Sequence, residues 1–185
     1  MKIFLFIDTL GSGGAQRQVL NMYEQLSKAG HTVEIVIYHN HLFYESDFDR
    51  LHAKIVCIEN KSPLKRMLLI RRYFRKEKPD IIISYLDSPN FIACFSSIGA
   101  HSWKLIINER SADEYKFKNY KHRIMKEISV FADKIVCNSM NAAAMWRKYC
   151  AKFADKLEVI YNIYDIKNDS AKRKVTSSFL MLSVS

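Results

Sequence analysis

The sequence predicts an α/β fold, a Rossmann-like, three-layer α/β/α domain built around a mostly parallel sheet. Short apolar runs of strand length alternate with amphipathic runs of helix length from residue 2 to residue 161. Several of the short runs are apolar throughout, as strands covered on both faces must be. Strands that alternate with helices in this way are typical of a parallel sheet with helices on its two faces.

The elements follow one another in a regular order. Strands are expected at 2–8, 32–38, 54–58, 81–84, 104–107, 134–137 and 157–161, and helices at 15–29, 63–76, 88–98, 118–131 and 138–152. Gly30 marks the end of the first helix, Ser62 and Pro63 open the second, and Asn138 and Ser139 are cap candidates for the last. The apolar stripe of the second helix is expected to contain Leu64, Met67, Leu68, Tyr73 and Phe74.

Composition excludes several classes of protein. The 185 residues are 49% hydrophobic, enough for a core without disulfides or metals. No apolar run approaches the ~18 residues of a transmembrane helix, and the N-terminal run is too short for a signal peptide. Four widely spaced cysteines form no C-x-x-C pair, which indicates reduced, partly buried cytosolic thiols.

The chain divides into one domain and the beginning of another. Residues 1–165 carry the alternating pattern, and the polar segment 166–178 has the composition of a linker. Residues 179–185 again resemble a buried strand, with no helix after it. We therefore expect an N-terminal domain, an interdomain linker and the first strand of a truncated C-terminal domain.

The first strand leads into a glycine-rich loop, Gly11-Ser12-Gly13-Gly14. Glycines allow backbone N–H groups to approach an anion, and a helix N-terminus adds its dipole, so the loop favours a phosphate ligand. A tight strand-to-helix turn explains the glycines equally well. The Walker pattern is absent, and Gln16 stands where the dinucleotide fingerprint needs a third glycine, which argues against NAD.

At this loop the chain resembles glycosyltransferase family 4, retaining enzymes of the GT-B fold. The run 13–17 is similar to the GGAER/GGAQR signature of that family, and four further segments match in order: 78–84, 132–139, 159–165 and 179–185. Ile163 replaces the usual proline of the segment 159–165. The resemblance implies the acceptor-side half of an enzyme that transfers a sugar from a nucleotide sugar to a glycan or polyprenol-linked acceptor. It implies no metal and no bound cofactor, and it implies that residues 1–185 alone are inactive. A non-enzymatic Rossmann-like module that binds an anionic ligand or partner is the alternative.

The resemblance also implies roles for individual residues. Gly13 and Gly14 would face the donor diphosphate, with Gln16 and Arg17 adding contacts or merely forming a solvated first turn. Glu109 and Arg110 are the catalytic candidates, where many relatives place a histidine at about Arg110. Arginine stays protonated, so Arg110 is expected to neutralise phosphate instead of acting as a base, and Glu109 to orient the acceptor.

The alternative to a catalytic role for Glu109 and Arg110 is an exposed ion pair without function. The other candidates at the strand ends are polar residues. Asp87, Asn90 and Asn108 are the candidates for acceptor binding, although Asp87 or Ser88 would more simply cap the following helix. The run His39-Asn40-His41 lacks a third metal ligand, so no metal site is expected.

The net charge of +10 comes from two short segments. Residues 61–78 contribute +7 and residues 116–126 contribute +5, which leaves the rest of the chain slightly acidic. A solvated face, an anionic membrane surface and nucleic acid are three possible explanations, and no recognisable motif supports nucleic acid. We expect peripheral binding at the cytoplasmic side of the inner membrane. The membrane-facing candidates are Lys65, Arg66, Arg72, Arg75, Lys76, Lys118 and Lys121.

Overall fold

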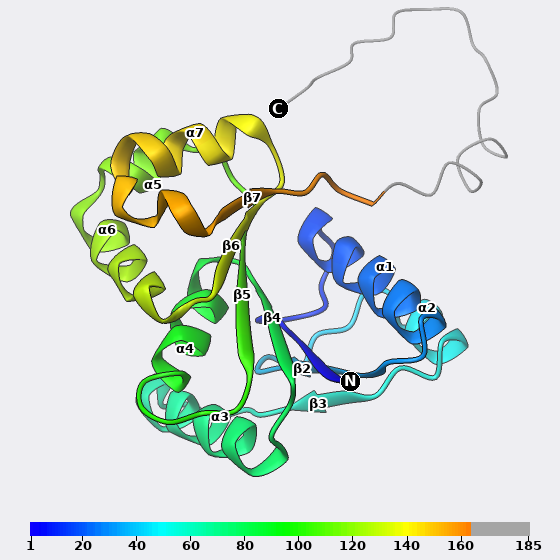
Figure 1. Cartoon of the computed structure of the whole chain (residues 1–185). Coiled ribbons are helices and arrows are strands. Elements are labelled where there is room, and N and C mark those ends of the chain that lie inside the picture. Colours follow the sequence, from blue (N-terminus) through cyan, green and yellow to red (C-terminus); the bar gives the residue numbers. More distant parts are fainter. Residues whose placement is uncertain (164–185) are drawn as a thin grey trace, which may run out of the picture.

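The chain forms a seven-stranded, all-parallel sheet with strand order β3-β2-β1-β4-β5-β6-β7 (Figure 1). The computed structural model describes residues 1–163, apart from the side chain of Lys121. The strands are β1 (Lys2–Phe6), β2 (Thr32–Ile37), β3 (Ile55–Cys57), β4 (Ile81–Tyr85), β5 (Lys104–Glu109), β6 (Lys134–Cys137) and β7 (Leu157–Val159). The sheet grows in both directions from the β1–β4 pair, so this pair is the topological switch point.

Helices cover both faces of the sheet. They are α1 (Gly14–Lys28), α2 (Glu45–Arg50), α3 (Pro63–Glu77), α4 (Asp87–Ser96), α5 (Glu114–Lys118), α6 (Tyr120–Glu127) and α7 (Met140–Tyr149), with 3₁₀ turns η1 (Ile128–Phe131) and η2 (Ala151–Lys156). Buried side chains of α1 and α2 pack with one face, and those of α3, α4, α5 and α7 with the other. The predicted three-layer α/β fold is confirmed, and the sheet is parallel throughout its described strands.

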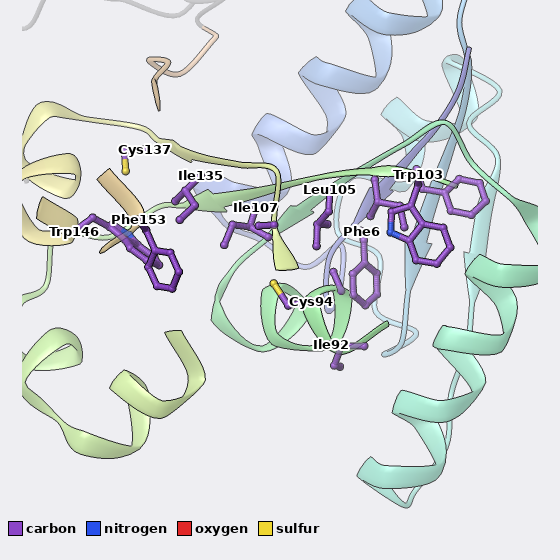
Figure 2. Packing of buried hydrophobic residues seen from close by; sticks show 14 of the residues in the cluster. Phe6, Ile92, Cys94, Trp103, Leu105, Ile107, Ile135, Cys137, Trp146 and Phe153 are labelled. Atoms are coloured by element: carbon purple, nitrogen blue, oxygen red, sulfur yellow. The ribbon is translucent and has the colours of Figure 1, made fainter. Parts of the chain in front are cut away.

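Alternation along β1 explains the two cores. Phe4 and Phe6 point to the α3/α4 side, whereas Ile3, Leu5 and Ile7 point to the α1/α2 side. Figure 2 shows the larger cluster, where Phe6 and Trp103 lie near one end and Trp146 and Phe153 near the other. Burial on both faces explains why the central strands read as unbroken apolar runs.

The predicted helix ends depend on caps, and most are confirmed. Ser62 accepts a hydrogen bond from the amide of Lys65 at 3.4 Å, with Pro63 as the first helical residue. Ser139 accepts one from the amide of Ala142 at 3.2 Å. Gly30 follows α1 with φ of +79°, a conformation that favours glycine.

Several boundaries differ from the prediction. The helices α2 and α5 were not expected, because each is only about one and a half turns long and carries little periodicity. The expected helix 118–131 is divided into the end of α5, α6 and η1. The linker 166–178 and the strand 179–185 lie outside the described residues, so both remain predictions.

Candidate functional site

The glycine loop joins β1 to α1 at the carboxyl edge of the sheet, and its three glycines have different surroundings. A Cβ on Gly11 would lie 2.9 Å from the His41 ring, and one on Gly13 would lie 2.3 Å from Oε1 of Gln16. A Cβ on Gly14 would meet nothing within 4 Å. Gly13 has extended backbone angles that any residue adopts, and no side chain caps α1. The first N–H groups of α1 are therefore free of a side-chain cap beside an exposed Gly14, as anion binding requires.

Gln16 and Arg17 point in different directions from the loop. Gln16 folds back over Gly13, where its amide oxygen fills the space of a missing Cβ. Arg17 forms an ion pair with Asp47 of α2 at 3.1 Å, and its guanidinium lies 5.5 Å from the centre of the Tyr44 ring. Neither side chain is simply solvated, and Arg17 is engaged with α2.

A second loop supports the glycine loop, and the sequence pattern does not predict this contact. The His41 carbonyl accepts hydrogen bonds from the Leu10 amide at 3.1 Å and the Thr9 hydroxyl at 3.0 Å. The Phe43 amide donates to the Leu10 carbonyl at 2.9 Å. These bonds, two between main-chain groups and one from the Thr9 side chain, hold the loop after β2 against the loop after β1.

The end of β4 carries a strained residue. Leu86 has φ of 76° and ψ of 159°, a region that glycine occupies almost exclusively and that costs about 1–3 kcal/mol for other residues. Leu86 is also the N-cap of α4, with no side-chain cap bond. The suggestion that Asp87 or Ser88 caps this helix is therefore wrong. Ser88 instead accepts a hydrogen bond from the Tyr38 hydroxyl at 3.0 Å.

Asp87, the first residue of α4, belongs to a charged cluster. Its carboxylate lies 3.1 Å from Nζ of Lys116 and 3.6 Å from Nζ of Lys126. Burial alone would raise the pKa of Asp87, but the two ammonium groups outweigh burial and hold this pKa below its ordinary value. Asp87 is therefore a charged, paired group, and its position ties α4 to α5 and α6.

Glu109 lies deeper in the same cluster. Its carboxylate accepts hydrogen bonds from Lys126 at 2.6 Å, from the indole of Trp146 at 3.2 Å and from the Ser111 amide at 3.2 Å. The side chains of Glu109 and Lys126 are 5% and 7% exposed. The alternative of an exposed Glu109–Arg110 pair is wrong, because Glu109 is buried and its cation is Lys126. A carboxylate so fully engaged has little capacity left to orient an acceptor.

Arg110 follows Glu109 at the carboxyl end of β5 and is half-buried. Its guanidinium lies 5.8 Å from the centre of the buried Tyr85 ring, and within residues 1–163 it has no hydrogen bond or ion pair. Burial lowers the pKa of Arg110 more than the nearby Tyr85 raises it, but an arginine stays charged. Arg110 is therefore a desolvated cation without an anionic partner in the described chain.

Asn90 and Asn108 connect strand ends to a helix. Nδ2 of Asn108 donates to the Ser84 carbonyl at 3.1 Å, and Nδ2 of Asn90 donates to the Asn108 carbonyl at 2.9 Å. Oδ1 of Asn90 is buried without a partner beside a cavity of about 20 Å³ that Asp87 and Lys126 also line. Their predicted contact with an acceptor stays a prediction, and the structure gives both amides a connecting role.

The predicted membrane-facing residues of α3 separate into two groups. Lys65, Arg72, Arg75 and Lys76 are exposed, although Arg75 also donates to the Ile98 carbonyl at 3.0 Å. Arg66 is half-buried with its guanidinium 4.5 Å from the centre of the Tyr38 ring. It lies in a groove at the carboxyl ends of β2 and β3, lined also by His39, Glu59 and Lys61.

The apolar stripe of α3 differs from the expected one. Phe74 and Ile70 are buried, whereas Leu64, Leu68 and Leu69 are 61%, 49% and 41% exposed. Leu64 and Leu68 of the predicted stripe therefore lie at the surface, because α3 is turned so that Ile70 and Phe74 meet the sheet. In the second basic segment, Lys118 is exposed and pairs with Glu114 at 3.2 Å, and the side chain of Lys121 lies outside the described part.

Two kinds of site are not found in the described residues. Residues 1–163 contain no group of three His, Cys, Asp or Glu side chains placed to hold a metal ion. No helix in this range is long and apolar enough to cross a bilayer.

All four cysteines are free; Cys94, Cys137 and Cys150 are buried, and burial raises the pKa of Cys94 and of Cys137 to about 12.

Comparisons with known proteins agree with this architecture. The chain is 29% identical over 176 residues to a Campylobacter jejuni enzyme named as an alpha-1,4-N-acetyl-D-galactosaminyltransferase acting on a GalNAc-containing, PP-undecaprenol-linked glycan. It is 26% identical over 184 residues to a second N-acetylgalactosaminyltransferase of that organism. These alignments cover 88% and 92% of the chain but only 46% and 50% of the two relatives.

A solved structure shows the same fold. The Anabaena protein HepE, solved in complex with UDP and glucose, superimposes with a TM-score of 0.75 at 15% identity, over 90% of this chain and 45% of HepE. The chain therefore spans about half the length of the proteins it matches. The family model described as Glycosyltransferase Family 4 matches residues 12–168, and the chain belongs to that family.

Proposed function

We propose that this chain is the acceptor-side half of a retaining glycosyltransferase. The enzyme would transfer a sugar from a nucleotide sugar to a glycan or polyprenol-linked acceptor, with no metal and with a C-terminal domain holding the donor. The family membership supports glycosyl transfer, and the named activities of the two Campylobacter relatives support a lipid-linked acceptor.

One structural observation carries the proposal. A helix N-terminus without a side-chain cap, at exposed Gly14, and an unpaired, desolvated guanidinium, at Arg110, lie at the same edge of the sheet. The strands before them, β1 and β5, are separated only by β4, which is a spacing of roughly 10 Å. Two positive groups at that separation fit a substrate that carries phosphate groups.

The chemistry follows from where charge develops. Departure of a nucleoside diphosphate builds negative charge on its oxygens, and fixed N–H groups near Gly13 and Gly14 stabilise this charge without reorganising. Arg110 would bind a phosphate through two parallel N–H bonds. Glu109 and Lys126 would hold the end of β5 in place, and with it Arg110.

The test is a transfer assay on this chain joined to its donor-binding half, with UDP- and GDP-sugars and a polyprenol-diphosphate-linked acceptor. We expect Arg110→Ala to lower kcat/KM by about 100-fold and Arg110→Lys to restore part of it, since one positioned charge stabilises a transition state by a few kcal/mol. Arg147→Ala, an exposed arginine on α7, is the matched control. Donor binding without any turnover would favour the non-enzymatic alternative, and turnover by residues 1–185 alone would contradict the assignment of the two halves.

We further propose that α3 binds the anionic inner face of the cytoplasmic membrane. Its exposed surface combines Leu64, Leu68 and Leu69 with Lys65 and Arg72, and several of these line a shallow groove of about 380 Å³. Exposed leucines beside basic side chains are typical of helices that lie in a membrane interface. The exposed Tyr120 and Ile124 of α6 lie on the same face of the sheet as α3, with α4 between them.

Vesicle co-sedimentation tests this surface. Replacing Lys65, Arg72 and Lys76 by Gln should weaken binding to anionic vesicles by about 100-fold, at about 1 kcal/mol for each basic residue. The matched control replaces Lys28, Lys148 and Lys152, which are exposed on other helices or turns. Equal binding of the parent chain to neutral and anionic vesicles would contradict the proposal.

A further inference from the structure

The segment that follows β7 is held by side chains of α1. The amide of Gln18 donates from Nε2 to the Ile163 carbonyl at 2.9 Å and accepts at Oε1 from the Ile163 amide at 2.8 Å. Nδ2 of Asn21 donates to the same carbonyl at 3.2 Å. Three hydrogen bonds thus converge on the main chain of one residue that belongs to no strand or helix.

These bonds connect distant parts of the fold. β7 is the last strand of the sheet, and three strands separate it from β1, which precedes α1. Figure 1 shows residues 160–163 (orange) leaving β7 and passing toward α1 (blue). The side chains of Ile160 and Tyr161 are 56% and 66% exposed, so packing does not hold this segment. Within the described chain, all hydrogen bonds of residues 161–163 go to Gln18 and Asn21.

Glutamine is well suited to this position. A primary amide carries a donor and an acceptor, and these match the carbonyl and the N–H of Ile163. A glutamate would lose the donor and place a charge against the carbonyl, and a methionine of similar length would lose both bonds.

Gln18, which holds Ile163, lies one helical turn from the glycine loop. Gly14, Gln18 and Asn21 are spaced i, i+4 and i+7, so they share one face of α1. The segment after β7 therefore lies over the helix face that begins at Gly14, where the N–H groups without a side-chain cap are found.

We propose that Gln18 is a positioning residue that couples the glycine loop to the direction in which the chain leaves the sheet. A change in the path of residues 160–163 would displace the first turns of α1, and an anion bound at the loop would fix that path. The consequence for transfer rests on the proposed function, but the coupling itself is a property of residues 1–163 and is tested without any assay of activity.

Spin-label distances measure the coupling. One label pair, Asn162→Cys with Lys28→Cys, reports the exit segment, and a second, Ser12→Cys with Lys28→Cys, reports the loop. Both are placed in a Cys57→Ser background, since the other three cysteines are buried. We expect Gln18→Met to broaden both distributions roughly twofold, because the segment then samples several conformations. Gln25→Met, the same change at an exposed position of α1, should leave both unchanged.

Hydrogen exchange supplies a second readout. The Ile163 amide should exchange about tenfold faster in Gln18→Met, which corresponds to one lost hydrogen bond. Suppose that Gln18→Met lowers the melting temperature but leaves the distance distribution of the Asn162 pair narrow. Gln18 then only stabilises the fold, and the proposal is overturned. If the distance distribution of the Asn162 pair broadens and that of the Ser12 pair does not, the proposed coupling to the glycine loop is overturned. Should Gln18→Met fail to fold, Asn21→Ala must produce a smaller broadening of the same kind, and its absence would equally overturn the proposal.

Discussion

The two basic segments carry similar charge patterns in the sequence and use them differently in the structure. On α3 the leucines and most cations face outward, and Ile70 and Phe74 alone meet the core fully. In residues 116–126, by contrast, Lys116 and Lys126 turn inward to Asp87 and Glu109. Lys126 also lies 4.5 Å and 4.8 Å from the ring centres of Phe117 and Trp146. Similar charge patterns therefore form a surface on α3 and an internal ion-pair cluster in residues 116–126.

The largest expected effect comes from removing the buried cation. Lys126→Met should lower the free energy of unfolding by about 3–5 kcal/mol, because it leaves the buried carboxylate of Glu109 without its cation. Arg72→Met on α3, the matched control, should change it by about 0.5 kcal/mol or less. Urea denaturation of both variants checks this, and equal losses would show that the segments do not differ.

The second prediction concerns pH. Because the folded-state pKa of Asp87 lies below its ordinary value of 3.8, its ion pairs stabilise the fold above that value. This stabilisation is lost as the pH falls through the lower, folded-state pKa. The difference in unfolding free energy between the parent and Asp87→Asn should therefore be constant near neutral pH and shrink on acidification below about pH 4. A difference that grows in acid would mean that burial, not Lys126 and Lys116, dominates at Asp87.

The smallest expected effect is the loss of stability when the N-cap side chain of α3 or of α5 is removed. Asp113 accepts a hydrogen bond from the Tyr115 amide at 3.0 Å, whereas the bond from the Lys65 amide to Ser62 is 3.4 Å long. We expect Asp113→Ala to cost about 1 kcal/mol and Ser62→Ala about 0.5 kcal/mol. Thermal melts suffice, and the reverse order would show that helix length outweighs cap geometry.

The fold could be predicted because strand and helix periods are local properties of the chain. The runs that became β1, β4 and β6 are apolar on both faces, and Gly30, Ser62 and Ser139 mark helix ends through backbone and side-chain chemistry of their own. The short helices α2 and α5 could not be predicted, since neither has enough turns to show a period.

The candidate site could be predicted only in part. Topology alone places Gly13, Gly14 and Arg110 at one edge, because carboxyl ends of parallel strands meet there. The sequence does not show that Lys126, seventeen residues after Glu109, is its partner, because a helix connection has to bring them together. The same holds for Gln18 and Ile163, whose pairing depends on the path of the chain after the last strand.

The strand order also determines how long the edge of β1 stays unpaired while the chain is synthesised. β1 pairs with β2 on one side and with β4 on the other, so its second edge stays open until residues 81–85 have been made. About 28 residues separate the end of β3 at Cys57 from the end of β4 at Tyr85, which is about one to six seconds of translation. During that interval the unpaired edge of β1, which is apolar from Ile3 to Phe6, is available for wrong pairing with other chains. Slower synthesis between residues 57 and 85 would therefore lengthen this exposure and raise aggregation.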